Sequence, residues 1–221
     1  MTNKEILSHI DHTLLKQFAT WEEIKVICDD AITYETASVC IPPSYVKKIK
    51  ETYGEQLNIC TVIGFPLGYN TTAVKVFEAV EAVNNGAAEI DMVINITALK
   101  NQDYDLVQNE IAEIKQAIGD KILKVIVETC FLTENEKVKV CELVTNAKAD
   151  YIKTSTGFGT AGATIADIRL FKANIGPDVK MKAAGGVKSV DDLIAFINEG
   201  CDRIGTSSAV KMLKGEAVSG Y

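Results

Sequence analysis

The sequence predicts an α/β protein, a single-domain (β/α)8 TIM barrel over residues 1–221, on the strength of three observations. Short apolar segments alternate with longer amphipathic segments along the whole chain. Eight such pairs give a repeat of roughly 28 residues, which is the length of one βα unit. The glycine-rich fingerprint of dinucleotide-binding sheets does not follow the first apolar segment, so a doubly wound open sheet is the weaker alternative.

The short apolar segments are the expected strands. They are rich in Val, Ile and Thr, and several are almost entirely apolar, as the strands of a buried parallel sheet are. In chain order they cover residues 10–15, 36–41, 57–65, 88–96, 122–129, 150–156, 179–184 and 202–208. Three of them repeat one order of residues, a small residue followed by an acid and an isoleucine, which supports repeated units.

The amphipathic segments between them carry helix start and stop signals. Four segments begin with Ser or Thr followed three residues later by an acid, which is the capping-box pattern. These pairs are Thr20 with Glu23, Thr133 with Glu136, Thr164 with Asp167, and Ser189 with Asp192. Glycines are expected to end four helices, at Gly86, Gly119, Gly176 and Gly200.

Composition and charge limit the classes of partner. The chain is 47% hydrophobic and carries a formal net charge of −7, so it is a poor candidate for binding nucleic acid or an anionic membrane. Its first residues lack the apolar core of a signal peptide, and no segment approaches the ~20 apolar residues of a membrane span. We therefore expect a cytoplasmic protein without nucleic-acid or membrane partners.

Cysteine and histidine usage argues against a metal centre. The six cysteines form no C-x-x-C pair, which favours reduced and mainly structural thiols. His9 and His12 belong to no Cys/His cluster, so we expect packing roles for them and no metal or other cofactor. Cys40, near the end of the second predicted strand, is either a buried structural thiol or a reactive thiol that faces a pocket.

Two lysines stand at strand ends, where barrel enzymes place their active sites. Lys153 ends the sixth predicted strand and Lys182 lies on the seventh, and neighbouring strands are about 4.8 Å apart. Like charge and burial both lower the pKa of an amine, and a neutral amine can form a Schiff base with a carbonyl. The alternative is a pair of lysines that reach for solvent at the barrel rim.

Two aspartates complete the candidate centre. Asp91 lies in an apolar segment, and a buried carboxylate needs a cationic or hydrogen-bonding partner. With a lysine it can move protons, although a purely structural ion pair is the alternative. Asp11, at the first strand, either orients a substrate hydroxyl or caps a turn.

Glycines and hydroxyl residues follow the last three predicted strands. Glycines allow the backbone N–H groups to approach an anion, and barrels commonly bind phosphate in their last two loops. Each segment alone is a weak signal, but their coincidence at consecutive strand ends predicts a phosphate site. Its candidate residues are Gly157, Gly185, Gly186, Gly205, Ser207 and Ser208.

With these residues in view, the chain closely resembles the deoxyribose-phosphate aldolase family, whose members are class I aldolases with a (β/α)8 fold. The resemblance covers nearly the whole chain. It is carried by residues 11–15 (DHTLL), 37–41 (ASVCI), 61–66 (TVIGFP), 89–93 (EIDMV), 124–129 (KVIVET), 151–158 (YIKTSTGF), 182–186 (KAAGG) and 205–208 (GTSS).

The resemblance implies reversible cleavage of 2-deoxy-D-ribose 5-phosphate to acetaldehyde and D-glyceraldehyde 3-phosphate, in deoxyribose phosphate catabolism. Lys153 matches the Schiff-base lysine, Lys182 the lysine that perturbs it, and Asp91 the proton-transferring aspartate. Asp11 matches a member of the same polar network, and Thr156 joins the glycine and serine positions around the sugar phosphate. No metal or cofactor is implied, and the partners are small phosphosugars and aldehydes. Relatives are often dimers or tetramers.

Three positions qualify the resemblance. Phe158 stands where longer relatives carry a lysine near the substrate, so phosphate binding is expected to rest more on backbone N–H groups. Ala184 replaces a serine of many relatives, with little expected effect. Tyr221 matches a C-terminal tyrosine that assists proton transfer in longer relatives, and it is an auxiliary candidate beside Cys40.

Two other functions remain open from the sequence alone. One is a phosphosugar isomerase or epimerase that uses Asp91 as a general base without covalent chemistry. The other is a non-catalytic sugar-phosphate sensor that retains the pocket. A covalent adduct on Lys153, trapped by reduction, separates the aldolase from both.

Overall fold

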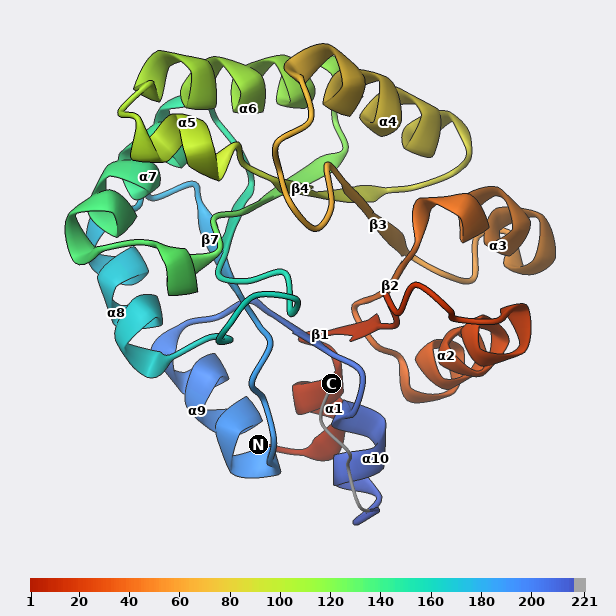
Figure 1. Ribbon diagram of the computed structural model, residues 1–221. Helices are drawn as coiled ribbons and strands as arrows, with labels where there is room; N and C mark the ends of the chain where they lie inside the picture. The colour runs from red at the N-terminus through yellow and green to blue at the C-terminus, as the bar shows by residue number, and fades with distance from the viewer. Residues whose placement is uncertain (217–221) are drawn as a thin grey trace.

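Eight parallel strands close into a barrel in this computed structural model, which describes residues 1–216 (Figure 1). Each strand pairs with its neighbours in the chain, and β1 closes the barrel against β8. The predicted (β/α)8 fold is therefore confirmed. The strands are β1 (Ile10–Thr13), β2 (Ser38–Ile41), β3 (Ile59–Ile63), β4 (Glu89–Val93), β5 (Ile122–Ile126), β6 (Tyr151–Lys153), β7 (Lys180–Ala184) and β8 (Arg203–Thr206).

The strands are shorter than the apolar segments that predicted them. The segment predicted over 150–156 contains only the three-residue strand β6, because the residues after Lys153 enter the loop that leads to α8. Lys153 is thus the last residue of its strand. A side chain at this position lies at the end of the barrel where the connecting loops gather.

A ring of helices surrounds the barrel (Figure 1). The helices are α1 (Asn3–Leu7), α2 (Trp21–Tyr34), α3 (Val46–Tyr53), α4 (Thr72–Asn84), α5 (Ile96–Lys100), α6 (Tyr104–Ile118), α7 (Glu134–Asn146), α8 (Ile165–Asn174), α9 (Val190–Glu199) and α10 (Ala209–Leu213), with 3-10 turns η1 (Pro43–Tyr45) and η2 (Thr129–Phe131). The capping boxes predicted at Thr20, Thr133 and Ser189 are present, and the Thr164 hydroxyl accepts the N–H of Asp167.

The predicted helix-ending glycines behave in two ways. Gly119 and Gly200 cap α6 and α9 with φ of 62° and 107°, a backbone region that glycine adopts without strain. Gly86 follows the end of α4 with φ of 110°. Gly176 directly follows the end of α8, whose C-cap residue Ile175 is in an extended conformation. Glycine is needed there because a Cβ would lie 2.4 Å from Thr145 Cγ2.

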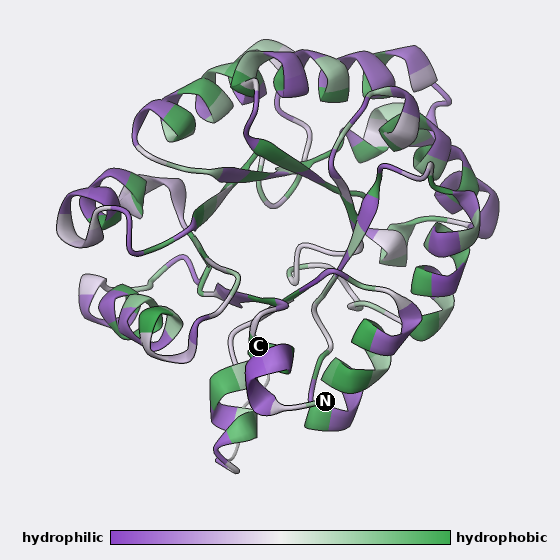
Figure 2. Ribbon diagram, turned by 180° about the vertical axis from the view of Figure 1, so that it is seen from behind, coloured by the Kyte–Doolittle hydropathy of each residue, from purple (hydrophilic) through white to green (hydrophobic). Residues whose placement is uncertain are grey.

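Apolar packing occupies two regions. The main core lies between the strands and the helices, and hydrophobic and hydrophilic residues alternate along the helices of the outer ring (Figure 2). A smaller apolar cluster of Leu15, Cys40, Cys60 and Val62 lies apart from it, with Phe65 packed against it. Charged side chains of several strands, among them Lys124 and Asp91, are also fully buried. The barrel therefore needs paired charges in its interior.

Among residues 1–216, every helix is too short or too polar to cross a lipid bilayer.

Candidate active site

Two lysines and an aspartate converge inside the barrel, where Lys153 ends β6 while Lys182 and Asp91 lie in the middle of β7 and β4. The register of β6 and β7 places Lys153 directly opposite Lys182. The Nζ atoms of Lys153 and Lys182 lie 2.8 Å and 2.7 Å from one oxygen, Asp91 Oδ2. Lys153 is 3% exposed, whereas Lys182 and Asp91 are fully buried. The structure thus brings together the three residues that the sequence singled out, and Lys153 is the one of the three that keeps any exposed surface.

The charge state of Lys182 differs from the expectation that paired lysines lower one another's pKa. Burial does act to lower the pKa of Lys182, but the carboxylates of Asp11 and Asp91 outweigh it and raise that pKa above its usual range. Lys182 Nζ lies 2.5 Å from Asp11 Oδ2. The expectation was wrong for Lys182 because it considered the neighbouring lysine and not the carboxylates. Lys182 is therefore a fixed positive charge beside Lys153.

Asp91 is held in its ionised form. Burial favours its neutral form, but the ammonium groups of Lys124, Lys153 and Lys182 lower the pKa of Asp91 well below its usual range. Its Oδ1 accepts a hydrogen bond from Lys124 Nζ at 2.9 Å and from the Cys60 thiol at 3.2 Å. Both oxygens of the carboxylate are thus occupied by cations or donors.

Lys124 was missed as a site residue by the sequence analysis. It lies on β5 directly opposite Asp91 of β4 and is fully buried. Although burial opposes its charge, the surrounding acids and the Cys60 thiol raise the pKa of Lys124 well above its usual range. An inward lysine in the apolar segment 122–129 was the available signal. The spacing alone did not show which acid it meets.

A second layer of ion pairs lies beside the first and contains Asp11. Arg203 Nε donates to Asp11 Oδ1 at 3.1 Å, and Arg203 Nη2 donates to Glu89 Oε1 at 3.1 Å. Ser38 also donates to Asp11 Oδ1, at 2.8 Å. Burial acts to raise the pKa of Asp11, but Lys182, Lys124 and Arg203 lower it. The turn-capping alternative for Asp11 is therefore wrong, because this carboxylate is fully buried within an ion-pair network.

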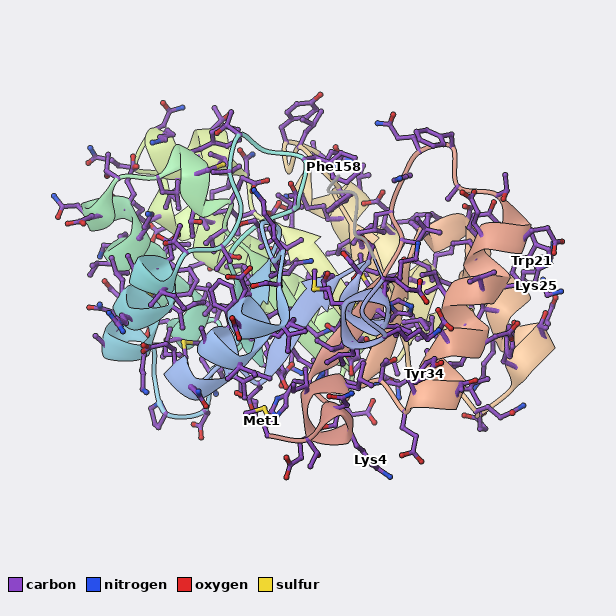
Figure 3. The ribbon with its side chains drawn as sticks, turned by 90° about the horizontal axis from the view of Figure 1, so that it is seen from below. Met1, Lys4, Trp21, Lys25, Tyr34 and Phe158 are labelled. Atoms are coloured by element: carbon purple, nitrogen blue, oxygen red, sulfur yellow. The ribbon has the colours of Figure 1, made fainter. Side chains whose placement is uncertain are left out.

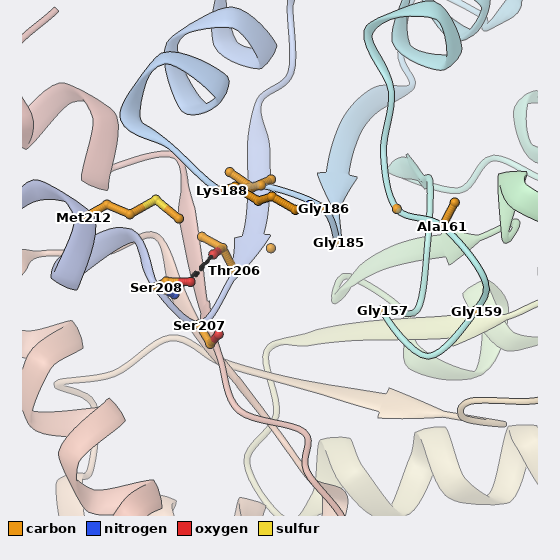
Figure 4. Close-up of a pocket in the computed structure, with 13 residues that line it drawn as sticks. Gly157, Gly159, Ala161, Gly185, Gly186, Lys188, Thr206, Ser207, Ser208 and Met212 are labelled. Carbon is orange, nitrogen blue, oxygen red and sulfur yellow. Dashed lines mark hydrogen bonds between the residues drawn. The ribbon is translucent and has the colours of Figure 1, made fainter. Parts of the chain in front are cut away.

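A cavity of about 540 Å³ opens between the loops that follow β6, β7 and β8 (Figure 4). All six candidate phosphate residues line it, and Gly157, Gly185 and Gly186 adopt positive φ. A Cβ on Gly162 would lie 2.3 Å from the Gly185 carbonyl carbon, so two of the loops pack backbone against backbone. A Cβ on Gly205 would lie 3.2 Å from Lys182 Cε, which places the cavity next to the lysine pair.

The cavity also has a cation that the sequence analysis missed. Lys188 lines it, at the loop after β7, and is exposed. Phe158, where the resemblance implied the loss of a lysine, stacks edge-on against Phe65 with ring centroids 5.4 Å apart. Figure 3 shows Phe158 at the opposite end of the molecule from Met1 and Lys4. The expected loss of one cationic contact at position 158 is thus accompanied by a lysine on the neighbouring loop.

Thr156 lies beside this cavity and is 6% exposed. Its hydroxyl donates a short hydrogen bond to Glu128 Oε2 and accepts the N–H of Phe158 at 2.9 Å. Glu128 was not a predicted site residue. The KVIVET segment contained it, but only the folded chain shows that it meets the loop after β6.

Comparison with known proteins decides the family. A family model described as DeoC/LacD family aldolase matches residues 6–210. The chain belongs to this family and is an aldolase. A relative named deoxyribose-phosphate aldolase from Clostridium botulinum (strain Alaska E43 / Type E3) is 63% identical over 221 residues, and the match covers 100% of both chains.

Solved structures resemble the aldolase over nearly its whole length. The structure titled "QR15, an Aldolase" is 40% identical with a TM-score of 0.91, and the match covers 96% of this chain and 95% of that one. Deoxyribose phosphate aldolase from Aeropyrum pernix, whose title describes a unique tetrameric structure, is 30% identical with a TM-score of 0.88. That match covers 97% of this chain and 92% of the other.

The thiols of the aldolase that lie nearest the centre are buried. Cys40 is directly opposite Cys60 in the register of β2 and β3, and both are fully buried. Their sulfur atoms and an Asp91 oxygen lie within 4.8 Å of one another, as do ligand atoms of Asp11, Cys60 and Glu89. Ammonium groups already contact these carboxylates, so the arrangement favours ion pairing over a bound metal ion.

The remaining candidates lie outside the lysine cluster. His9 Nδ1 lies 2.9 Å from the Asp202 carbonyl oxygen, and His12 Nε2 lies 3.6 Å from Asp30 Oδ2. Burial lowers the pKa of His12 in spite of Asp30, which favours a neutral ring. Tyr221 lies outside the described residues.

Proposed function

We propose that this aldolase cleaves 2-deoxy-D-ribose 5-phosphate reversibly to acetaldehyde and D-glyceraldehyde 3-phosphate through a Schiff base on Lys153. The observation that carries the proposal is the Lys153 amine at the end of β6, which is 3% exposed and held 2.8 Å from a buried aspartate. The loop that follows it lines a cavity of about 540 Å³. Full-length relatives bear the name deoxyribose-phosphate aldolase, which supports this substrate.

The reaction begins at the Lys153 amine. In its neutral form this amine attacks C1 of the open-chain sugar, and loss of water from the carbinolamine gives a protonated imine. Asp91 lies within hydrogen-bonding distance of Lys153 Nζ and is the group that takes up and returns protons in these steps. Lys182, held protonated by Asp11 and Asp91, is a positive charge directly opposite Lys153 and shares Asp91 Oδ2 with it.

The carbon–carbon bond breaks once the imine has formed. Acetaldehyde takes C1 and C2, so the electrons of the C2–C3 bond move into the iminium and leave an enamine on Lys153. The C3 hydroxyl loses its proton as C3 becomes the aldehyde carbon of glyceraldehyde 3-phosphate. Protonation of the enamine at C2 and hydrolysis of the imine then release acetaldehyde and restore the lysine. The protonated imine is the electron sink, so the scheme needs no cofactor.

The phosphate group is proposed to bind in the cavity after β6, β7 and β8. Glycine backbones with positive φ at Gly157, Gly185 and Gly186 allow N–H groups to approach an anion closely. Lys188 supplies a positive charge there, which opposes the net negative charge of the whole chain at this point. Ser207 and Ser208 add hydroxyl donors from the loop after β8.

Reductive trapping tests this function. The protein is incubated with deoxyribose 5-phosphate or acetaldehyde, reduced with borohydride and digested for mass spectrometry. We expect the adduct on Lys153 and its loss, together with cleavage activity, in Lys153→Ala. Lys180→Ala, which removes an exposed lysine of β7 two residues before Lys182, is the matched control and should retain both.

Three results would contradict the aldolase proposal. Cleavage that survives Lys153→Ala without any adduct would remove the Schiff base from the mechanism. Interconversion of phosphosugars without a trapped protein would indicate an isomerase. Binding of deoxyribose 5-phosphate without turnover would indicate a sensor.

The location, the partners and the oligomeric state of the enzyme are also proposals. We infer a cytoplasmic aldolase without nucleic-acid or membrane partners, and the net charge of −7 supports this. We further infer a homo-oligomer, a dimer or a tetramer, supported by the tetrameric Aeropyrum pernix enzyme and by exposed apolar side chains on α4 and α6. These side chains are Val74, Phe77, Val80 and Leu106. Light scattering of the purified protein decides the oligomeric state.

A further inference from the structure

Glu128 is a buried carboxyl group next to the proposed reaction centre that the scheme above does not use. It follows β5 and is 2% exposed. Its backbone has φ of 52° and ψ of 67°, a left-handed conformation that costs energy in a residue with a side chain. Burial raises the pKa of Glu128 despite its hydrogen bonds. A strained backbone and a desolvated carboxyl group are both unfavourable for stability, which points to a functional reason for their presence.

Both oxygens of this carboxyl group are directed at one residue of the loop after β6. Glu128 Oε1 accepts the backbone N–H of Thr156 at 3.2 Å, and Oε2 accepts the Thr156 hydroxyl in a short hydrogen bond. The same hydroxyl oxygen accepts the N–H of Phe158 at 2.9 Å. The hydroxyl proton of Thr156 is therefore committed to Glu128, and one lone pair of the oxygen remains for another donor.

The packing around Glu128 leaves it little freedom to move. A Cβ on Gly159 would lie 3.1 Å from Glu128 Cδ and 2.9 Å from Cys130 Sγ, so the loop closes over the carboxyl group only because residue 159 is glycine. The Cys130 thiol lies 3.9 Å from Glu128 Oε1. Gly157 and Gly159, on either side of Phe158, line the cavity of about 540 Å³.

We propose that Glu128 is a positioning residue for substrate binding: it fixes the Thr156 hydroxyl so that its free lone pair accepts a hydroxyl group of the sugar. The inference rests on the proposed function, because it takes the ligand to be a phosphosugar with hydroxyl donors. Glu128 acts through Thr156 and not on Lys153. Its contribution is therefore to binding rather than to imine formation.

If Glu128 has this role, substrate binding should depend on the protonation state of its carboxyl group. An ionised Glu128 only accepts hydrogen bonds, whereas a protonated Glu128 can donate one to the Thr156 oxygen, and the Thr156 hydroxyl proton then turns away from Glu128. Because burial raises the pKa of Glu128, this change occurs at a higher pH than for an exposed glutamate. The groups that face Glu128 are Lys153 from β6, Cys130 from η2 and Thr156.

The test is a comparison of Glu128→Gln with wild type. The amide can donate to the Thr156 oxygen, so it reverses this hydrogen bond with almost no change in shape. We expect the KM for deoxyribose 5-phosphate to rise about tenfold, as for the loss of one hydrogen bond between neutral groups. We also expect the rise in KM on acidification, present in wild type, to be absent in the variant. Borohydride-trapped adduct formation with acetaldehyde should be unchanged.

Glu110→Gln is the matched control. Glu110 is a buried glutamate on α6 whose pKa is also raised by burial, and it pairs with Lys75 outside the cavity. Its replacement should leave the KM unchanged. Since ionised Glu128 is disfavoured by burial, Glu128→Gln should melt at the same temperature as wild type or higher. A purely structural role for Glu128 predicts a lower melting temperature instead.

Thr156 variants provide a second measurement that holds even if Glu128→Gln fails to fold. Thr156→Val should raise the KM as Glu128→Gln does, Thr156→Ser should not, and the double variant should be no worse than Thr156→Val alone. An equal KM in Thr156→Val and Thr156→Ser, or in Glu128→Gln and wild type, overturns the inference. So does a loss of acetaldehyde adduct in Glu128→Gln. A wild-type protein without cleavage activity would overturn the proposed function itself, which is a distinct result.

Discussion

Single residues in this barrel are understood only with the charges around them. Lys153 and Lys182 lie opposite each other on adjacent strands and share one oxygen of Asp91, yet their surroundings differ. Lys182 has Asp11 as a second acid at 2.5 Å, whereas Lys153 ends its strand at the cavity side. One lysine is thus fixed as a cation, and the other is left to react.

The fixed charge of Lys182 leads to a prediction about pH. Lys182→Met removes the positive charge that lies directly opposite Lys153, so adduct formation with acetaldehyde should require a higher pH, by about one unit. The measurement is the rate of borohydride-trapped adduct as a function of pH. Lys180→Met, on the same strand but exposed, should keep the wild-type profile. An unchanged profile in Lys182→Met would refute an electrostatic role for this lysine.

At the scale of elements, the strands were predictable because each one is a local apolar segment with a turn signal after it. The predicted strand end is confirmed for Lys153, but it is wrong for Lys182 and Asp91, which lie in the middle of β7 and β4. Lys124 and Glu128 were missed, because their importance depends on a partner on another strand or loop. Asp91 and Thr156 lie 33 and 28 residues away from them in the chain.

In the loops after β7 and β8 the sequence also predicted only part of the site, and the structure of these loops supports a testable prediction. The glycines in these loops predicted a phosphate site. In the sequence, nothing distinguishes the exposed Lys188 from other surface lysines, so its place in the cavity was not predicted. Lys188→Met should raise the KM for deoxyribose 5-phosphate about tenfold, because one charged contact to the phosphate is lost. Adduct formation with acetaldehyde, which has no phosphate, should be unaffected.

A control separates a phosphate contact from a general change in charge. Lys172→Met removes an exposed lysine of α8 that lies outside the cavity, and its KM should equal that of wild type. Equal KM values for all three proteins would place the phosphate elsewhere.

Across the whole molecule, the barrel interior is a network of ion pairs. Asp11, Glu89 and Asp91 meet four cations there, and all three acids are fully buried. The four cations are Lys124, Lys153, Lys182 and Arg203. This network includes the reactive lysine. The stability of the barrel also depends on it, because any buried charge that loses its partner is strongly unfavourable.

Arg203 tests how far stability depends on this network. Arg203→Met removes a cation that contacts Asp11 and Glu89 at 3.1 Å each, so unfolding should require about 3 kcal/mol less free energy. The loss should grow as pH rises, because Arg203 is one of the cations that lower the pKa of Asp11 and so stabilise its ionised form. Denaturant unfolding at several pH values measures it.

The matched control for Arg203 lies on the surface. Arg169 pairs with Glu199 at 2.5 Å but is 67% exposed, so Arg169→Met should leave the unfolding free energy nearly unchanged at every pH. If both variants unfold alike, the interior pairs contribute no more than a solvated ion pair. In that case the rigidity of Lys153 would have to come from the apolar packing between the strands and the helices, and the charges inside the barrel would serve the reaction alone.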